Sequence, residues 1–313
     1  MRSYLLARLA ALLPVLLGVS LLAFALANLA PGDPAEQVLR QGGQEPTPEQ
    51  VQALRHQLGL DAPFAVRYAR WLGAVLHGDL GRSYADRRPV AQELARRFPA
   101  TLELAAGALL IALAIGIPGG VLAAVRRDTL FDHACRTIAL LLASLPGFAL
   151  ALFLIYLFAV RLHALPVAGY GGGDLRHLAL PALALSAATA ATLLRLTRAS
   201  LLEVWSMEFV RTARAKGLPE SAILWQHALR NALLPTVTVA ATSFGRMLGG
   251  AAIVEVIFAW PGIGKYVVDA IYARDYPVIQ GFVLWMGVTF VLVNLATDLL
   301  YRRIDPRIRL GGR

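Results

Sequence analysis

The stretch that decides the fold class is TIALLLASLPGFALALFLIYLFAV, which runs from Thr137 to Val160 and contains no charged residue. At a rise of about 1.5 Å per residue, a helix of this length is long enough to cross the roughly 30 Å hydrocarbon core of a bilayer. Similar apolar runs occur at about Leu9–Leu29, Thr101–Val125, Leu178–Leu196, Leu233–Trp260 and Val278–Tyr301. The sequence therefore predicts an all-α, polytopic membrane protein with about six transmembrane helices.

The composition agrees with a lipid environment. Hydrophobic residues make up 57% of the chain and charged residues only 16%, whereas soluble domains are about one quarter charged. The net charge of +10 would suggest nucleic acid in a soluble protein, but in a membrane protein such an excess marks cytoplasmic loops. We therefore expect the lipid bilayer, and no nucleic acid, as a partner. The single cysteine, Cys135, excludes an intrachain disulfide or a CxxC motif.

The distribution of basic residues predicts the orientation. The short loops on one side hold only Arg161, Arg176, Lys265 and Arg274, and many more arginines flank the other ends of the runs. Both termini are therefore predicted to be cytoplasmic. The first run, which follows Arg2 and Arg8, could alternatively be a signal peptide cleaved near Ala27–Ala30. Its apolar stretch is longer than the 7–15 residues of a signal peptide, which favours a retained anchor.

The predicted spans divide the chain into four segments. We expect an N-terminal transmembrane helix over residues 1–30, an external insert over 31–98, a five-helix core over 99–301 and a cytoplasmic tail over 302–313. The insert has nearly balanced charges and a helix start at Thr47-Pro48-Glu49. Within the core, prolines are predicted to interrupt helices at Pro118-Gly-Gly120, Pro146-Gly147 and Pro181.

The connection between the fourth and fifth spans, residues 203–235, is too long for a minimal loop. Its sequence is amphipathic and compatible with two short helices, broken at Gly217 and restarted by Pro219. We expect Phe209, Ala213 and Leu218 to share one face of the first helix. Ile223, Leu224 and Leu229 form an apolar strip on the second. Such a segment either lies on the membrane, with its arginines on anionic headgroups, or docks into the groove of a partner.

Two stretches in this connection carry a specific resemblance: RTARAKG at 211–217 and HALRNALLP at 227–235. They resemble the cytoplasmic EAA loop of ABC importer permeases, in the form of the oligopeptide, dipeptide and nickel branch. Arg211 stands where the general loop has its acidic residue, and Gly217 stands at its glycine. Further matching stretches extend over most of the chain: Pro31–Pro34, Leu58–Asp61, Gly78–Ser83, Pro99–Leu104, Phe258–Gly264, Arg274–Gln280 and Asp305–Arg309.

The resemblance implies a type I ABC importer permease fold in the inner (plasma) membrane of a bacterium. It also implies a second homologous permease subunit, two ABC ATPase subunits and an external substrate-binding protein as partners. ATP and magnesium would be bound by the ATPases, and this chain would bind no cofactor. The residues implied to couple to an ATPase are Glu208, Arg211, Thr212, Ala213, Arg214, Lys216, Gly217, His227, Arg230, Asn231 and Pro235.

The resemblance leaves the cargo open. Leu165–Gly172 and Phe258–Pro261 are most similar to the nickel permease subunit, which implies transport of nickel, as a chelate, or of a di- or oligopeptide. A permease for oligopeptides, dipeptides or metallophores is the alternative within the family. A self-sufficient secondary transporter or channel is the alternative from another class.

No catalytic or metal site is predicted. The stretch Gly262-Ile-Gly-Lys265 lacks the spacing and the hydroxyl of a phosphate-binding loop, so ATP hydrolysis is expected on another chain. The histidines, which are His56, His77, His133, His163, His177 and His227, show no metal-binding spacing. An intramembrane enzyme is disfavoured because no Gly-x-Ser-x-Gly motif occurs.

Two charged residues lie within the fifth apolar run, Arg246 and Glu255. An unpaired charge at that depth costs at least a few kcal/mol, so each needs a partner or a wet cavity. Nine residues apart on one helix, they cannot contact each other. We therefore expect them either to line the translocation pathway or to form buried structural pairs.

Overall fold

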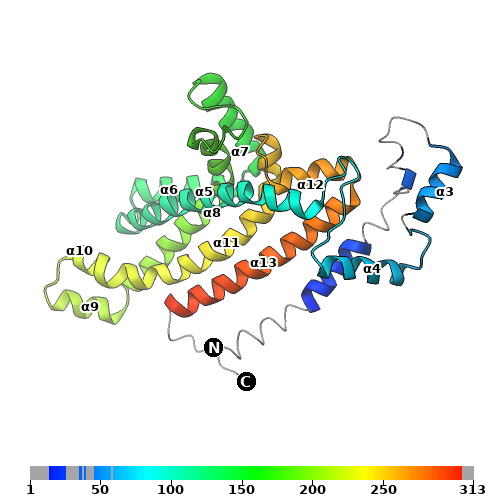
Figure 1. The fold of residues 1–313 in the computed structure, drawn as a ribbon. Coiled ribbons are helices and arrows are strands. Elements are labelled where there is room, and N and C mark those ends of the chain that lie inside the picture. Colours follow the sequence, from blue (N-terminus) through cyan, green and yellow to red (C-terminus); the bar gives the residue numbers. More distant parts are fainter. Residues whose placement is uncertain (1–13, 26–34, 37–38, 40–45, 58, 305–313) are drawn as a thin grey trace. The chain divides into compact units, whose positions relative to one another are not determined.

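The protein is described by a computed structural model that covers residues 14–25, 35–36, 39, 46–57 and 59–304 (Figure 1). In these residues the fold is helical, and the only β-type pairing is an isolated bridge between Arg82 and Pro89. An apolar helix, Pro14–Ala25, comes first. The labelled elements are α3 (Pro48–Gln57), α4 (Phe64–Leu76), α5 (Val90–Val125), α6 (Leu130–Ser144), α7 (Gly147–Leu154), the π-helix η1 (Ile155–Arg161), α8 (Leu175–Trp205), α9 (Glu208–Ala215), α10 (Glu220–Ala222), the π-helix η2 (Ile223–Ala228), α11 (Leu229–Ile257), α12 (Ile263–Tyr272) and α13 (Tyr276–Ile304).

Among the described residues, the helices long and apolar enough to cross a membrane are Val90–Val125, Leu175–Trp205, Glu220–Ile257 and Tyr276–Leu299. They coincide with four of the predicted spans. A fifth is counted if α6 and the following helical segment form one broken span. The predicted first span, Leu9–Leu29, lies partly outside the described residues, and its described part is the helix Pro14–Ala25.

The run from Thr137 to Val160 is bent at the interruption predicted for Pro146-Gly147. The segments Leu130–Ser144 and Gly147–Arg161 meet at an angle of 108°. Leu145 is extended, with ψ at 130°, and Pro146 precedes α7 with ψ at 132°. Proline disfavours the helical conformation of the residue before it, so the helix ends there and restarts in another direction.

The other two predicted interruptions were wrong. Pro118 lies within the continuous helix α5, and Pro181 lies within the continuous helix α8. A proline removes one backbone hydrogen bond, but neighbouring helices can compensate for this loss in a packed membrane bundle. Pro181 is itself buried.

Helices α5 and α8 approach closely at two glycines one helical turn apart. A Cβ atom at Gly116 would lie 2.7 Å from Cβ of Leu193, and one at Gly120 would lie 2.6 Å from both the carbonyl oxygen of Leu194 and Cβ of Thr197. No side chain larger than hydrogen fits there without a shift of the backbone. Small residues four apart are a common way for membrane helices to pack.

We therefore expect Gly120→Ala to destabilise the protein by about 1–3 kcal/mol through overpacking. Gly249→Ala, in α11, is a matched control because nothing lies within 4 Å of its added Cβ and alanine favours a helix. Thermal unfolding of the detergent-solubilised protein would compare the two variants. Equal stability of both variants would contradict the close packing.

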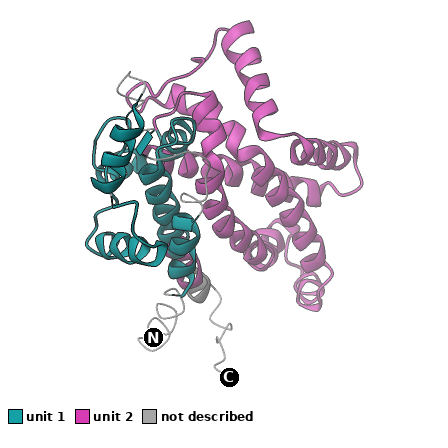
Figure 2. Cartoon of the chain, turned by 90° about the vertical axis from the view of Figure 1, so that its right-hand side faces the viewer, with its two compact units in different colours: residues 1–99, 262–291 teal, residues 100–261, 292–313 magenta. Residues whose placement is uncertain are grey.

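The chain divides into two compact units, residues 1–99 with 262–291 and residues 100–261 with 292–313 (Figure 2). In the first unit, Phe24 packs edge-on against the rings of Phe64 and Tyr68 at 5.3 and 5.5 Å. Buried Asp275 accepts a hydrogen bond of 2.6 Å from the hydroxyl of Ser83. Burial, together with this carboxylate, raises the pKa of Tyr84 to about 12.

The second unit is a helical bundle in which α8 packs against α6, α7 and α11. The division into units does not follow the four linear segments that we expected, because residues 262–291 group with the first 99. The four-segment division remains a prediction about membrane topology.

Candidate functional site

The connection between α8 and α11 forms a helical hairpin, here taken as residues 206–228. The helix α9 follows α8 after a break at Ser206 and Met207, and the chain then reverses into α10 and η2. In Figure 1 this hairpin lies at the left-hand end of α11. The helix α9 confirms the first of the two predicted short helices. The second, α10 with η2, is not separate, because it continues without a break into α11 as one helix of 38 residues, Glu220–Ile257.

The turn of the hairpin is built around Gly217, whose φ is 78°. The N–H of Gly217 donates to the carbonyl oxygen of Arg214 at 2.9 Å, and the N–H of Leu218 donates to that of Ala213 at 3.3 Å. This is the Schellman pattern, in which a left-handed residue closes a helix. Glycine is favoured at such a φ because it has no Cβ. Pro219 then precedes α10.

The inner face of the hairpin is a small apolar cluster. It consists of Val210, Ala213 and Ile223, with Trp205 packed against them. We expected Phe209 and Leu218 on this face with Ala213, but both are exposed, at 38% each. A helix as short as α9 buries few positions, and here they are Val210 and Ala213. Of the predicted apolar strip on the second segment, Ile223 and Leu229 are buried and Leu224 is half-buried.

The base of the hairpin is anchored in the bundle. A second cluster joins Val121 and Ala124 of α5, Leu201 and Val204 of α8, and Ala228, Leu229 and Ala232 near the start of α11. Leu224 of η2 packs against this cluster. A force applied to the hairpin would therefore reach three of the long helices together.

Most of the residues that the resemblance implied are exposed. On the hairpin these are Glu208, Arg211, Thr212, Arg214, Lys216, Gly217 and His227, and at the start of α11 they are Arg230, Asn231 and Pro235, whereas Ala213 is buried. Arg214 spans the turn, with Nε at 2.6 Å and Nη2 at 3.2 Å from the two carboxylate oxygens of Glu220. This bond raises the pKa of Arg214. Arg211 pairs with Glu208 at 2.9 Å.

Large apolar side chains are also exposed on the hairpin, which the sequence did not lead us to expect. Met207 is 40% exposed and Trp225 is 64% exposed, in addition to Phe209 and Leu218. Exposed aromatic residues and methionine beside arginine are typical of a binding surface for another protein. A tryptophan on the polar side of an amphipathic segment is the signal that could have indicated it.

The two charged residues of the fifth apolar run differ in their surroundings. Glu255 is fully buried and accepts a hydrogen bond of 2.6 Å from the hydroxyl of Thr101 on α5. This is the geometry of the buried structural pair that we considered beside a role in the pathway. Arg246 is exposed, and its Nη2 donates to the hydroxyl of Ser243 one turn away at 2.8 Å.

Glu255 belongs to a network at the end of α11. Trp260 is fully buried and donates from its indole N–H to the carbonyl oxygen of Ala100 at 2.8 Å. The ring of Tyr170 packs edge-on against Trp260 at 4.8 Å, and its hydroxyl donates to Glu103 at 2.7 Å. This hydrogen bond raises the pKa of Tyr170. The network thus ties the loop before α8 to α5 and to the end of α11.

Two family models match the sequence. Residues 116–310 match the binding-protein-dependent transport system inner membrane component, and residues 1–105 match the N-terminal component of such transport system membrane proteins. The chain belongs to this permease family. The resemblance seen in the sequence is therefore confirmed at the level of the family.

Named relatives of this permease align over nearly their whole length. The glutathione transport system permease protein GsiC of Shigella flexneri is 42% identical over 309 residues, and the alignment covers 99% of each chain. The dipeptide transport system permease protein DppB of Escherichia coli K12 is 41% identical over 338 residues, again covering 99% of each. A putative peptide transport system permease protein of Brucella abortus is 43% identical over 315 residues and 99% of each.

A solved structure supports the fold. A chain of the MetNI methionine ABC transporter, in an inward-facing conformation, superposes with a TM-score of 0.56 at 23% identity. The match covers 68% of this permease and 96% of that chain. The predicted type I importer permease fold is thereby confirmed. Within the described residues, no group of three His, Cys, Asp or Glu side chains is arranged to hold a metal ion.

Proposed function

We propose that this chain is the membrane-spanning permease subunit of an ATP-driven importer of short peptides. The relatives described above are named for glutathione, dipeptide and peptide transport, and they are 41–43% identical over 99% of the chain. We therefore rank peptides above nickel as the cargo. This reverses the order that the sequence motifs alone suggested. Nickel, as a chelate, and metallophores remain the second candidates.

The proposal includes the assembly around the chain. We propose a second homologous permease beside it, two ABC ATPase subunits that bind ATP and magnesium, and an external binding protein that delivers the cargo. The chain would be a multi-pass protein of a bacterial inner membrane with both termini in the cytoplasm, where the ATPases are. Its own role would be to conduct the cargo across the membrane and to couple that movement to ATP hydrolysis by the ATPases.

The observation that carries the proposal is the construction of the hairpin. Its inner face is buried against Trp205, its base packs into a cluster shared by α5, α8 and α11, and its outer face is exposed. An exposed element with an anchored base suits the transmission of movement from a partner to the membrane helices. Arg246, exposed within a membrane span, is our candidate for the translocation pathway.

Reversing the charges of Arg214 and Lys216 to glutamate is expected to abolish uptake while the protein still inserts. The double variant would place acidic groups on the surface proposed to bind the ATPase, and it would also set a new carboxylate at position 214 beside that of Glu220. Uptake of labelled peptide and cargo-stimulated ATP hydrolysis by the reconstituted transporter would measure the effect. Unchanged stimulation would contradict the proposal.

A charge swap separates contact with a partner from support of the turn. In the swap variant Arg214→Glu with Glu220→Arg, the ion pair across the turn can form again, but the surface charge is reversed at both positions. If Arg214 binds the ATPase, uptake stays low in the swap. If Arg214 only supports the turn, uptake returns.

The rival functions are tested by transport in liposomes. The permease alone is expected to be inactive on an ion gradient and to require ATP, the ATPases and the binding protein. Transport by the isolated chain would favour a secondary transporter or a channel. Direct binding of dipeptides, glutathione and nickel chelates to the partner binding protein would identify the cargo.

A further inference from the structure

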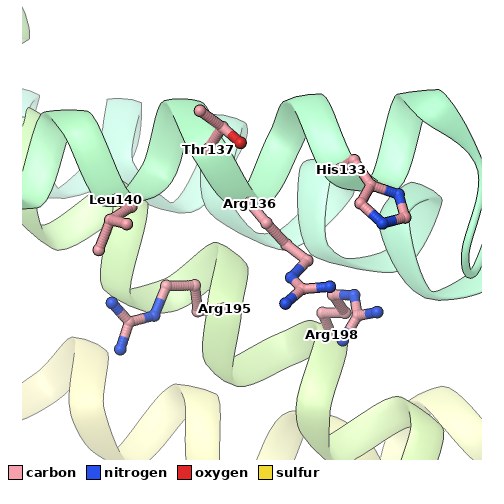
Figure 3. Close-up of a pocket in the computed structure, with 6 residues that line it drawn as sticks. All are labelled: His133, Arg136, Thr137, Leu140, Arg195 and Arg198. Atoms are coloured by element: carbon pink, nitrogen blue, oxygen red, sulfur yellow. The ribbon is translucent and has the colours of Figure 1, made fainter.

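A basic pocket lies between α6 and α8, away from the hairpin. It has a volume of about 440 Å³ and is lined by His133, Arg136, Thr137, Leu140, Arg195 and Arg198. Figure 3 shows Arg136 reaching from α6 toward Arg198 on α8. Three arginines and a histidine thus line one cavity.

The protein neutralises only part of this charge. Arg198 donates to both carboxylate oxygens of the fully buried Asp132, each at 2.6 Å. One of these oxygens also accepts the backbone N–H of Asp128 at 3.0 Å. Among the described residues, Arg136 and Arg195 make no hydrogen bond and no ion pair, and both are exposed. The pocket therefore keeps a net positive charge that an anion would balance.

The surroundings of the pocket indicate which anion. Leu140 forms part of its wall and is 58% exposed, and its neighbours Ile138 and Leu141 are exposed by 56% and 58%. One helical turn before Leu140, the wall of the pocket carries the cationic side chain of Arg136. Cationic and apolar surfaces thus adjoin along one helix. That combination fits a molecule with an anionic head and an apolar tail better than free phosphate.

We propose that this pocket binds the phosphate headgroup of an anionic phospholipid, held by Arg136 and Arg195, with its acyl chains along the apolar surface that begins at Leu140. Arginine presents several N–H donors in a planar fork that matches phosphate oxygens. Basic pockets between membrane helices on the cytoplasmic side are known to suit lipid headgroups. The proposal does not depend on the cargo or on what the hairpin contacts.

The test is a lipid titration of the complete, delipidated transporter, followed by native mass spectrometry. Phosphatidylglycerol is expected to bind at low concentration and phosphatidylcholine to bind much more weakly. Each of the variants Arg136→Gln and Arg195→Gln should lower the affinity for phosphatidylglycerol about five-fold, because a basic residue near a lipid surface contributes about 1 kcal/mol and 1.4 kcal/mol equals a factor of ten. Arg136→Lys keeps the charge and should retain most of the affinity.

Arg127→Gln is the matched control. Arg127 is equally basic and exposed, but it lies outside the pocket and pairs with Asp128 at 3.1 Å. The Arg127→Gln variant should leave the affinity for phosphatidylglycerol unchanged. The proposal is overturned if the control loses as much affinity as the pocket variants, since the attraction would then be diffuse. It is also overturned if inorganic phosphate displaces the lipid at equal concentration, or if the two phospholipids bind equally well.

Discussion

Replacing Gly217 with proline is expected to abolish ATP-driven uptake, the largest effect that we predict for a single residue of the hairpin. Proline holds φ near −65°, but the turn requires a φ of 78° at this position. Proline also removes the N–H that donates to the carbonyl oxygen of Arg214 at 2.9 Å. We expect the end of α9 to unwind at a cost of about 3 kcal/mol and the outer face to lose its shape.

The measurement is cargo-stimulated ATP hydrolysis by the reconstituted transporter, together with the amount of variant in the membrane. Insertion should be normal, because the long apolar helices are unchanged. Gly217→Asn is the control, since asparagine tolerates the left-handed conformation better than other residues. It should retain most of the uptake. A proline variant with full stimulation would show that the shape of the turn is irrelevant to coupling.

Replacing Arg198 with leucine is expected to cause the largest loss of stability, about 3–5 kcal/mol. Asp132 is fully buried and receives both of its short bonds from Arg198, which is itself only 16% exposed. Without the guanidinium, the hydrogen-bond donor that remains for the buried carboxylate among the described residues is the backbone N–H of Asp128. Removing one partner of a buried ion pair typically costs this much.

The double variant Asp132→Leu with Arg198→Leu is the decisive comparison. It removes both charges, and apolar residues in place of a buried pair are often neutral or stabilising. Thermal unfolding of the solubilised protein should therefore show recovery relative to Arg198→Leu alone. A double variant that is as unstable as the single one would mean that the loss comes from packing around position 198, not from the unpaired carboxylate.

The elements marked by local signals could be predicted from the sequence. The hairpin was located because Gly217 and Pro219 act on the backbone within a few residues. The break at Pro146 was predicted for the same reason, but its angle of 108° was not. We attribute that angle to tertiary packing, since α7 contacts both α8 and α11. Pro118 and Pro181 carry the same local signal, but packing in the bundle overrides it.

Contacts between residues far apart in the chain could not be predicted from the sequence. The partner of Glu255 is Thr101, separated by 154 residues, and Trp260 bonds to Ala100 across 160. Neither pairing leaves a periodic pattern along the chain. The buried face of α9 was also misjudged, because Val210 and Phe209 are adjacent and a short amphipathic helix fits either choice. The basic pocket was missed for a similar reason, since its arginines come from two helices.

The close approach of α5 and α8 limits how this protein can change shape. Where Gly116 and Gly120 meet Leu193, Leu194 and Thr197, the two backbones have no room for an added methyl group. Sliding either helix along the other would bring a larger side chain into that gap. We therefore expect the pair to move as a rigid body, and we expect any hinge used in transport to lie elsewhere in the chain.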